Sequence, residues 1–446
     1  MPGVTRLFGT DGVRGVANRD LTPELALALG RAAVGVLGGG RRPRIVVGRD
    51  TRASGELLEA ALCAGLCSSE ADVVRVGVVP TPAVAFLTVD VEARMGVVIS
   101  ASHNPPDYNG MKFFSAEGAK LPDDIELEME RLVRQGGGPR PEGAALGRIT
   151  DSEDAAERYL QHLVAAADGT LAGMRVVIDC ANGAAYRLGP EILRRLGAEV
   201  YAIHDEPDGS NINVDCGATH PEAITEAVRR FGADAGVAHD GDADRAILSD
   251  ADGNVIDGDQ ILAAAALAYK GEGRLAENTV VSTVMANLGF RKTMEGAGIA
   301  MAETQVGDRY VLEEMHRLGA VLGGEQSGHI IFRDHATTGD GLLTAAWFLS
   351  QARKQGSTVA ELAATTPRYP QVLQNVPVVN HAPLDEAEAV WEAVRIAEEA
   401  LGTQGRVLVR ASGTEPLVRV MVEAETEEDA HKHAEAISAA VQSSLG

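Results

Sequence analysis

The chain has 446 residues, more than one hydrophobic core usually supports, so about two to four domains are expected. Its apolar fraction of 45%, with 50 glycines and few aromatic residues, is typical of a glycine-punctuated α/β protein. The formal net charge of −24 argues against nucleic acid and membranes as partners, because such a surface repels both nucleic acid and anionic lipid. It repels a phosphorylated ligand too, so a phosphate site requires a local cluster of arginines and backbone N–H groups.

The four cysteines, Cys63, Cys67, Cys180 and Cys216, are scattered along the chain. Cys63 and Cys67 lie in one expected helix, at a spacing that fits a buried helix face better than a zinc site. The N-terminal segment lacks the apolar stretch of a signal peptide, and the longest apolar run, residues 261–269, is too short to span a bilayer. We therefore expect a cytoplasmic protein with reduced, structural cysteines.

The chain opens with a polar, glycine-rich loop at residues 8–15 that contains Arg14. A functional loop and a surface turn are equally good interpretations of this segment on its own. Alternating strands and helices follow it. A helix is expected from Pro23, and strands are expected at residues 44–47 and 73–79, each followed by a helix.

The next strand, at residues 97–99, is β-branched and ends abruptly in the polar segment 100–106. This pattern predicts a buried strand that delivers a loop to the edge of a sheet, where open α/β folds bind their ligands. Ser102 and His103 lie side by side in that loop. They are the first candidate catalytic residues.

The dipeptide Asn109-Gly110 predicts a turn that brings the chain back, so that Lys112 follows close to Ser102. A hydroxyl, an imidazole and an ammonium group are then confined to one short segment. The alternative is a polar turn whose serine and asparagine satisfy backbone groups. Taken alone, a single Ser-His pair favours that alternative, so the interpretation depends on the rest of the chain.

The same layout recurs twice. Strands expected at residues 174–178 and 279–284 each precede a polar turn and a helix, and short strands that begin at residues 236 and 319 open into further polar loops. Three diverged α/β units, each presenting one loop at an equivalent place, are the simplest explanation. The predicted fold class is therefore α/β, with three similar domains built on mixed sheets. Their expected limits are residues 1–154, 155–254 and 255–368.

From about residue 369 the pattern changes. A strand is expected at residues 374–379, an amphipathic helix at 384–400, and an antiparallel pair at 406–410 and 417–423, followed by a last helix. This pattern predicts a smaller C-terminal α+β domain, residues 369–446, joined to the others by a hinge-like segment.

The loop after the strand that begins at residue 236 carries Asp240, Asp242 and Asp244. Three carboxylates at alternate positions repel one another unless a cation lies between them. A calcium-binding EF-hand is excluded, because Arg245 stands where that motif needs glycine and Ala251 where it needs glutamate. Carboxylate ligands favour a hard ion, and Mg²⁺ fits best because it commonly shares its shell with a substrate phosphate. The alternative is a solvated acidic turn.

A second candidate loop combines Gly324, Glu325, Gln326 and Ser327. Its carboxylate, amide and hydroxyl groups can hydrogen-bond several hydroxyls of a sugar at once, and their spacing does not suit a metal. A plain turn is an equally good interpretation of this segment alone.

A third candidate loop lies at residues 410–416 and has the features of an anion cradle. A glycine lets backbone N–H groups converge, two hydroxyls donate, and two arginines flank the loop. The alternative is an ordinary hairpin tip. The residues of the candidate cradle are Arg410, Ser412, Gly413, Thr414 and Arg419.

The segment SASHNPPDYNGMKFF, residues 100–114, resembles the phosphoserine loop of the α-D-phosphohexomutase family, and the other loops resemble the family's remaining motifs. The resemblance extends over nearly the whole chain. It implies that Ser102 carries a phosphate that is exchanged with a phosphosugar. A metal-dependent phosphatase and a non-catalytic sugar-phosphate sensor are the rival hypotheses.

The resemblance also implies roles for individual residues. One Mg²⁺ per chain is held by the phosphate on Ser102 and by the three aspartates. Arg14 faces the phosphoserine, and Lys112 lies near the hydroxyl that gives or takes the proton. Catalytic roles are implied for His103, Arg245 and His329, the last as an acid, a base or a phosphate contact. Residues 324–327 bind the sugar, and the loop between Arg410 and Arg419 holds the phosphate that is not transferred.

Within the family, Gln326 and the opening FGTDG segment are similar to the branch that acts on glucosamine phosphates; the phosphomannomutase/phosphoglucomutase branch usually has methionine at the position of Gln326. This implies a hexosamine phosphate as the small-molecule partner and glucosamine 1,6-bisphosphate as activator and intermediate. Other hexose phosphates are the alternative substrates. The oligomeric state is left open, with a homodimer as one option.

Overall fold

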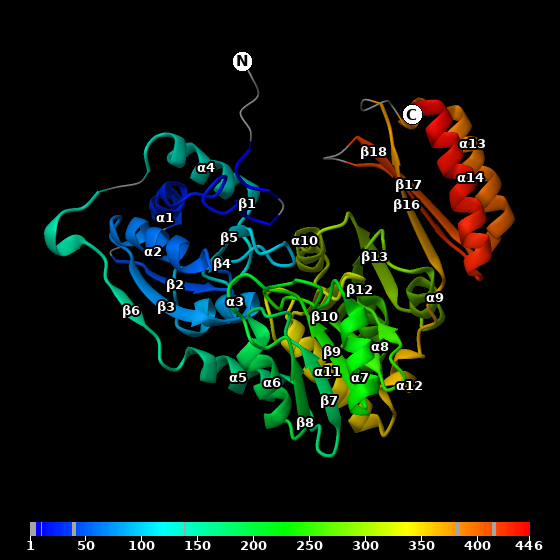
Figure 1. Ribbon diagram of the computed structural model, residues 1–446, viewed down its shortest axis with the longest axis horizontal. Helices are drawn as coiled ribbons and strands as arrows, with labels where there is room; N and C mark the ends of the chain where they lie inside the picture. Colours follow the sequence, from blue (N-terminus) through cyan, green and yellow to red (C-terminus); the bar gives the residue numbers. More distant parts are fainter. Residues whose placement is uncertain (1–5, 10, 38–41, 138–139, 380–383, 413–415) are drawn as a thin grey trace. The chain divides into compact units, whose positions relative to one another are not determined.

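The computed structural model describes residues 6–9, 11–37, 42–137, 140–379, 384–412 and 416–446 (Figure 1). The chain forms two compact units. The first contains Met1–Met285 and Ala300–Ala364, and the second contains Ala286–Ile299 and Thr365–Gly446. The first unit holds three mixed sheets, and the second holds one antiparallel sheet.

The first sheet has six strands. In order across the sheet they are β1 (Val13–Val16), β5 (Tyr108–Phe114), β4 (Met95–Ile99), β2 (Arg44–Arg49), β3 (Asp72–Val78) and β6 (Ile149–Asp151). Strands β4, β2, β3 and β6 run parallel, whereas β5 runs antiparallel to β4. The helices are α1 (Pro23–Leu37), α2 (Gly55–Cys67), α3 (Thr81–Asp90) and α4 (Asp123–Arg134), with a 3₁₀ turn at Gly143–Ala145.

Strand β4 is buried along its whole length because helices cover both faces of the sheet. Successive side chains of a strand point to opposite faces. Met95, Val97 and Ile99 belong to the core that contains α1 and α2, whereas Gly96 packs against α3, where an added Cβ would meet Thr88. This two-sided burial explains the unbroken apolar run that predicts the strand.

The turn predicted at Asn109-Gly110 is wrong, because both residues lie inside β5. The chain reverses earlier, between Ser102 and Asp107. The Asn109 side chain does not close a hairpin: its amide donates to Ser54 Oγ at 2.9 Å, and its oxygen accepts from the Gly110 N–H at 2.8 Å. Lys112 nevertheless returns beside the serine loop, because β5 pairs with β4.

The second sheet has five strands and the third has four. The second runs β11 (Val255–Ile256), β10 (Ala246–Asp250), β9 (Ala235–His239), β7 (Arg175–Asp179) and β8 (Glu199–Ile203); the third runs β13 (Ala300–Thr304), β12 (Thr279–Thr283), β14 (Leu322–Gly324) and β15 (Ile330–Phe332). The helices of these two domains are α5 (Ala155–Ala166), α6 (Ala185–Arg195), α7 (Pro221–Phe231), α8 (Gly258–Gly271), α10 (Asp308–Leu318), α11 (Gly341–Gln355) and α12 (Val359–Ala363), with a 3₁₀ turn at Ala276–Asn278.

The three sheets share one feature. In each, a parallel strand turns back into an antiparallel neighbour: β4 into β5, β9 into β10, and β14 into β15. Each of these reversals is one of the polar loops singled out above. The prediction of three similar α/β domains with mixed sheets is therefore confirmed.

The second unit has a three-stranded antiparallel sheet in the order β16 (Gln371–Pro377), β18 (Leu417–Glu423) and β17 (Arg406–Ala411). Helices α13 (Glu388–Leu401) and α14 (Glu427–Leu445) lie together on one face of it (Figure 1). The unit also contains α9 (Leu288–Gly296) and 3₁₀ turns at Leu384–Glu386 and Gly402–Gln404. The smaller C-terminal α+β domain is confirmed, with its first strand starting earlier than expected.

Within the part of the chain that the structure describes, no helix combines the length and the hydropathy needed to cross a membrane. All four cysteines are free, and Cys67 alone of them is more than slightly exposed. Burial raises the pKa of the Cys63 and Cys216 thiols to about 12, so both are neutral at physiological pH.

Candidate active site

The serine loop and the aspartate loop meet, although they are far apart in the sequence. The Ser102 hydroxyl donates to Asp240 Oδ2 at 2.7 Å, and the Ser102 side chain is almost fully buried. Thr81, at the start of α3, fixes the aspartate loop: its N–H donates to the Asp242 carbonyl at 2.9 Å and its hydroxyl to Asp242 Oδ2 at 2.6 Å. The strand ends of two domains thus bring one hydroxyl and three carboxylates together.

The aspartate loop has the donor set of a site for a hard cation. One oxygen from each of Asp240, Asp242 and Asp244 lies within 4.8 Å of the others. Each residue also has a buried Oδ1 that finds no hydrogen-bond partner among the described residues. Burial, followed by the neighbouring carboxylates of Asp244 and Asp242, raises the pKa of Asp240 well above its usual value. Unpaired, mutually repelling oxygens of this kind fit Mg²⁺.

Lys112, on β5, supplies the positive charge next to these carboxylates. Its Nζ lies 2.8 Å from Asp242 Oδ2, 2.9 Å from Asp11 Oδ2 and 3.5 Å from Asp244 Oδ2. Burial lowers the pKa of Lys112, but Asp11, Asp242 and Asp244 together outweigh burial and leave it raised. Lys112 is therefore an ammonium group inside the site.

His103 and Arg245 are two further predicted catalytic residues beside these loops. His103 Nδ1 is 3.3 Å from the Ser102 hydroxyl oxygen. Burial, then the nearby charges of Arg245 and Arg14, lower the pKa of His103 to about 4, so its ring is neutral at neutral pH. Arg245 Nε is 3.8 Å from Asp244 Oδ1.

His329 is buried behind Asp244 and does not contact Ser102 or His103 in any described interaction. Its Nδ1 lies 3.8 Å from Asp244 Oδ2, and the Gly339 N–H donates to its Nε2 at 3.1 Å. Burial lowers the pKa of His329, while Asp244 and Asp308 outweigh burial and raise it. The hydrogen bond from the Gly339 N–H needs an unprotonated Nε2. It leaves the ring proton on Nδ1, facing Asp244.

The predicted sugar loop follows β14 and is tied to the aspartate loop, since the Ala246 N–H donates to the Gly328 carbonyl at 3.1 Å. Glu325 Oε1 accepts from the Gly307 N–H at 2.9 Å, which fixes the carboxylate. The Gln326 carbonyl accepts from the Gly258 N–H at 3.0 Å. The buried Ser327 hydroxyl finds no hydrogen-bond partner among the described residues.

The predicted anion cradle lies in the second unit. Arg410 and Arg419 are directly opposite each other on β17 and β18, so two cations share one face of the sheet. Burial, then the neighbouring Arg419, lowers the pKa of Arg410. Ser412 is buried and its N–H donates to the Leu417 carbonyl at 2.8 Å. Gly413 and Thr414 lie outside the described residues.

Models of the phosphoglucomutase/phosphomannomutase family match the chain in four places. Domain I matches residues 5–138, domain II 157–253, domain III 257–369 and the C-terminal domain 373–440. Together they cover most of the chain, in the order that the family has. The chain belongs to the phosphoglucomutase/phosphomannomutase family.

Similar proteins are known in several bacteria. Proteins named phosphoglucosamine mutase from Frankia alni and Moorella thermoacetica are 54% and 55% identical to it, and the alignments cover 99% and 95% of this chain and 99% and 96% of theirs. A solved phosphoglucomutase/phosphomannomutase family protein from Burkholderia thailandensis has a TM-score of 0.81 at 25% identity, over 99% of this chain and 98% of that one. As a member of this family, the chain is a phosphosugar mutase and hence an isomerase.

Three charged residues that the structure brings into the site are not among the candidate site residues predicted from the sequence. Asp11 pairs with Arg14, Lys112 and Lys120, and Lys120 pairs in turn with Asp308 at the start of α10. Asp11 could have been suspected from its place in the opening glycine-rich loop. Lys120 and Asp308 pair across domains, which no local pattern reveals.

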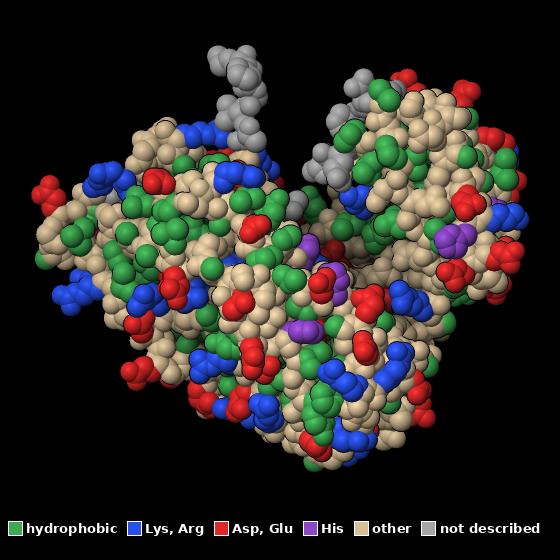
Figure 2. All heavy atoms as spheres, in the orientation of Figure 1, with side chains coloured by type: hydrophobic (Ala, Val, Ile, Leu, Met, Phe, Trp, Pro, Cys, Tyr) green, Lys and Arg blue, Asp and Glu red, His purple; other side chains and the backbone are tan. Residues whose placement is uncertain are grey.

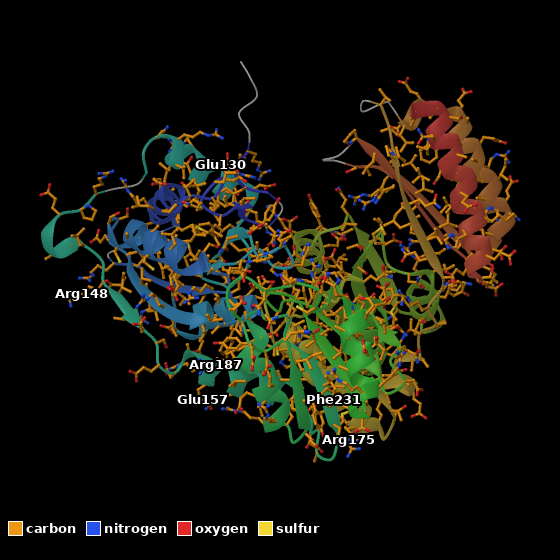
Figure 3. The ribbon with its side chains drawn as sticks, in the orientation of Figure 1. Glu130, Arg148, Glu157, Arg175, Arg187 and Phe231 are labelled. Carbon is orange, nitrogen blue, oxygen red and sulfur yellow. The ribbon has the colours of Figure 1, made fainter. Side chains whose placement is uncertain are left out.

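Glu130 on α4, labelled in Figure 3, holds the segment that leads to Asp11. Its Oε1 accepts from the N–H groups of Leu7 and Phe8, at 2.8 and 3.0 Å. The face of the molecule in Figure 2 carries acidic and basic side chains interspersed. Lys112, in contrast, is buried inside the candidate site.

Proposed function

We propose that this protein interconverts glucosamine 6-phosphate and glucosamine 1-phosphate through a phosphate carried on Ser102. The hydrogen bond from the Ser102 hydroxyl to Asp240, in a loop of carboxylates with unpaired oxygens, is the observation that carries the proposal. It supports a role for Ser102 as a nucleophile beside a cation site. The name shared by relatives at about 55% identity supports glucosamine as the sugar.

Asp240, Asp242, Asp244 and the phosphate on Ser102 would hold one Mg²⁺, because the donor set is made of hard oxygens only. Such an ion withdraws charge from a transferring phosphoryl group. The protein adds positive potential of its own from Lys112, Arg14 and Arg245, and fixed charges in a buried site are effective because they need no reorganisation.

The protonation states of the chain's own residues support further proposed roles. Lys112 is the candidate group for exchanging a proton with the sugar hydroxyl that receives or loses phosphate, as the family resemblance implies. Neutral His103 lies within reach of the Ser102 hydroxyl. His329 would act through Asp244, whose carboxylate its Nδ1–H faces.

Binding is divided between two loops. Residues Gly324, Glu325, Gln326 and Ser327 would hold the sugar hydroxyls and the amino group, and the unpaired Ser327 hydroxyl supports this. The second loop would hold the phosphate that is not transferred, which explains why two arginines face each other on β17 and β18. Its residues are Arg410, Ser412, Gly413, Thr414 and Arg419. Glucosamine 1,6-bisphosphate would turn round between the two transfers, so that its other phosphate reaches Ser102. This loop must therefore accept either phosphate of the bisphosphate.

The test compares kcat/KM for glucosamine 6-phosphate, glucose 6-phosphate and mannose 6-phosphate, each with its own 1,6-bisphosphate as activator. A clear but incomplete preference for glucosamine 6-phosphate is expected. The oxygens of Glu325 and Gln326 can accept from a 2-ammonium group, but they also tolerate a hydroxyl. A value for glucose 6-phosphate equal to or above that for glucosamine 6-phosphate would contradict the sugar assignment and leave the mutase chemistry intact.

The same assay separates a mutase from a phosphatase. Inorganic phosphate should be released far more slowly than the sugar phosphates interconvert. The setting we propose is the cytoplasm, where the product would serve the synthesis of UDP-N-acetylglucosamine and peptidoglycan precursors.

A further inference from the structure

Arg52, in the turn that follows β2, is buried completely, and each of its five N–H groups has an acceptor. Nε donates to Asp50 Oδ2 at 2.9 Å. The other four N–H groups donate to backbone carbonyls of one short segment, which is the serine loop. The acceptors are the carbonyls of Ser102 at 2.9 Å, Asn104 at 2.8 Å, Tyr108 at 2.9 Å and Pro105.

Asp50 extends this network to the other side of Ser102. Its Oδ1 accepts from the Arg52 N–H at 3.0 Å, and its Oδ2 accepts from the Ser100 hydroxyl at 2.6 Å. The Ser100 oxygen in turn accepts from the Ser102 N–H at 3.0 Å. The peptide groups on both sides of the Ser102 Cα are therefore held, the carbonyl by Arg52 directly and the N–H through Ser100 and Asp50.

Ser102 has a backbone conformation that needs such support. Its φ is 51°, in the left-handed region that residues with a Cβ rarely adopt. Conformations of this kind persist only where the surroundings over-determine them, and they cluster at functional sites. Asn213 adds a second donor from the neighbouring domain, with its amide 2.8 Å from the Ser102 carbonyl.

We propose that Arg52 is a positioning residue for the phosphoryl transfer: its guanidinium holds the serine loop by its carbonyls and keeps the Ser102 oxygen aimed at Asp240. The inference rests on the proposed function and goes beyond it, because no described interaction joins Arg52 to Asp240, Asp242 or Asp244. Only a planar group with five fixed donors matches these five acceptors. Lysine has the same charge but three donors, so it cannot replace arginine here.

The test is the Arg52→Lys variant beside the wild-type protein. We expect kcat to fall by about 10²-fold, the loss typical of a misplacement of about 1 Å at a reacting group. KM for the monophosphate should change little, because the sugar and distal-phosphate loops are untouched. Arg75→Lys is the matched control: Arg75 is a paired arginine on β3, bound to Asp151, and lies outside the serine loop, so its kcat should match the wild type.

Chemical rescue separates positioning from mere structural support. Arg52→Ala leaves a guanidinium-shaped cavity, so millimolar guanidinium should restore part of kcat, whereas urea at the same concentration should not. If Arg52→Ala does not fold, as judged by cooperative urea unfolding, the Arg52→Lys variant carries the test alone. A folded Arg52→Lys with wild-type kcat overturns the inference, and so does a folded Arg52→Ala that guanidinium and urea affect alike. Wild-type protein inactive on glucosamine phosphates would instead overturn the proposed function.

Discussion

Asp179 and Asp240 are buried aspartates at the ends of two neighbouring strands, but their carboxylates differ in hydrogen bonding. Asp179 is the last residue of β7, and Asp240 directly follows β9. The two strands are paired in the sheet. Both oxygens of Asp179 accept backbone hydrogen bonds at 2.9 Å, one from Ala181 and one from Gly217. Asp240 accepts one hydrogen bond, from Ser102, and its second oxygen has no described partner.

The comparison shows that two aspartates alike in burial and in position on the sheet can differ in whether their oxygens are paired. Asp179, His204 and Cys216 also form a cluster with metal-ligand chemistry, and His204 Nδ1 lies 3.0 Å from Asp179. Yet the Asp179 carboxylate is already occupied by the backbone of its own loops, so it supports the fold. The aspartates at 240–244 keep oxygens unpaired, at a cost in stability that the proposed cation would relieve.

The largest effect is expected at the Ser102 hydroxyl, the proposed nucleophile. Ser102→Ala should lose nearly all mutase activity while folding normally, because covalent transfer has no other acceptor. Ser100 cannot substitute, since its hydroxyl is buried and bound to Asp50. Assays of glucosamine 6-phosphate conversion, with Ser357→Ala as a control far from the loop, measure this. Activity close to wild type in the Ser102→Ala variant would contradict the assignment of the nucleophile.

Asp242→Asn tests whether the aspartate loop, whose carboxylates keep unpaired oxygens, binds Mg²⁺. We expect a large fall in turnover and a higher Mg²⁺ concentration for half-maximal rate, because one of three charged ligands is lost. The free energy of unfolding of the metal-free protein should change little, because the relief of repulsion offsets the loss of the Lys112–Asp242 ion pair. An unchanged Mg²⁺ requirement would show that the loop is not the metal site.

Asp179→Asn tests whether the carboxylate whose oxygens both accept backbone hydrogen bonds supports the fold and not metal binding. An amide offers one acceptor where two backbone N–H groups need one each, so the variant should lose about 3 kcal/mol of stability, the size of a hydrogen bond to a charged group. Urea unfolding measures this loss. The Mg²⁺ concentration for half-maximal rate should stay at the wild-type value. A shift in that value as large as in Asp242→Asn would remove the distinction between the two aspartates.

The smallest effect is expected at a third buried carboxylate, Asp340, which accepts from the Leu343 N–H at 2.9 Å and from the Tyr159 hydroxyl at 2.8 Å. Burial raises its pKa to about 6, although both hydrogen bonds act against the rise. Because the folded pKa exceeds the unfolded value of about 3.9, the folded state binds more protons between these values, and this group's contribution to stability falls as pH rises through that window.

Tyr159→Phe should therefore cost about 1.5 kcal/mol at pH 7.5, where the carboxylate is charged, and less at pH 5, where it is largely protonated. Urea unfolding at the two pH values measures the difference. A larger loss at pH 5 than at pH 7.5 would mean that Asp340 is not a charged hydrogen-bond acceptor in the folded protein.

Much of this arrangement could be predicted from the sequence. Each apolar run followed by a polar loop marks a strand reversal at the site, and three carboxylates at alternate positions distinguish the aspartate loop from the single Asp179. The turn predicted at Asn109-Gly110 is wrong because these residues pair as a strand with β4. The roles of Arg52 and Lys120 could not be predicted, since their partners are set by tertiary pairing between distant segments.

The most direct test of phosphate transfer from Ser102 to the sugar is a single turnover of the phosphorylated protein. Protein phosphorylated with glucosamine 1,6-bisphosphate and freed of excess ligand is mixed with glucosamine 6-phosphate in the presence of Mg²⁺. We expect the intact mass of the protein to fall by one phosphate, and phosphopeptide mapping to locate the loss at Ser102. The phosphate should appear in the bisphosphate. Phosphate that stays on the protein, or that is released as inorganic phosphate, would contradict this transfer.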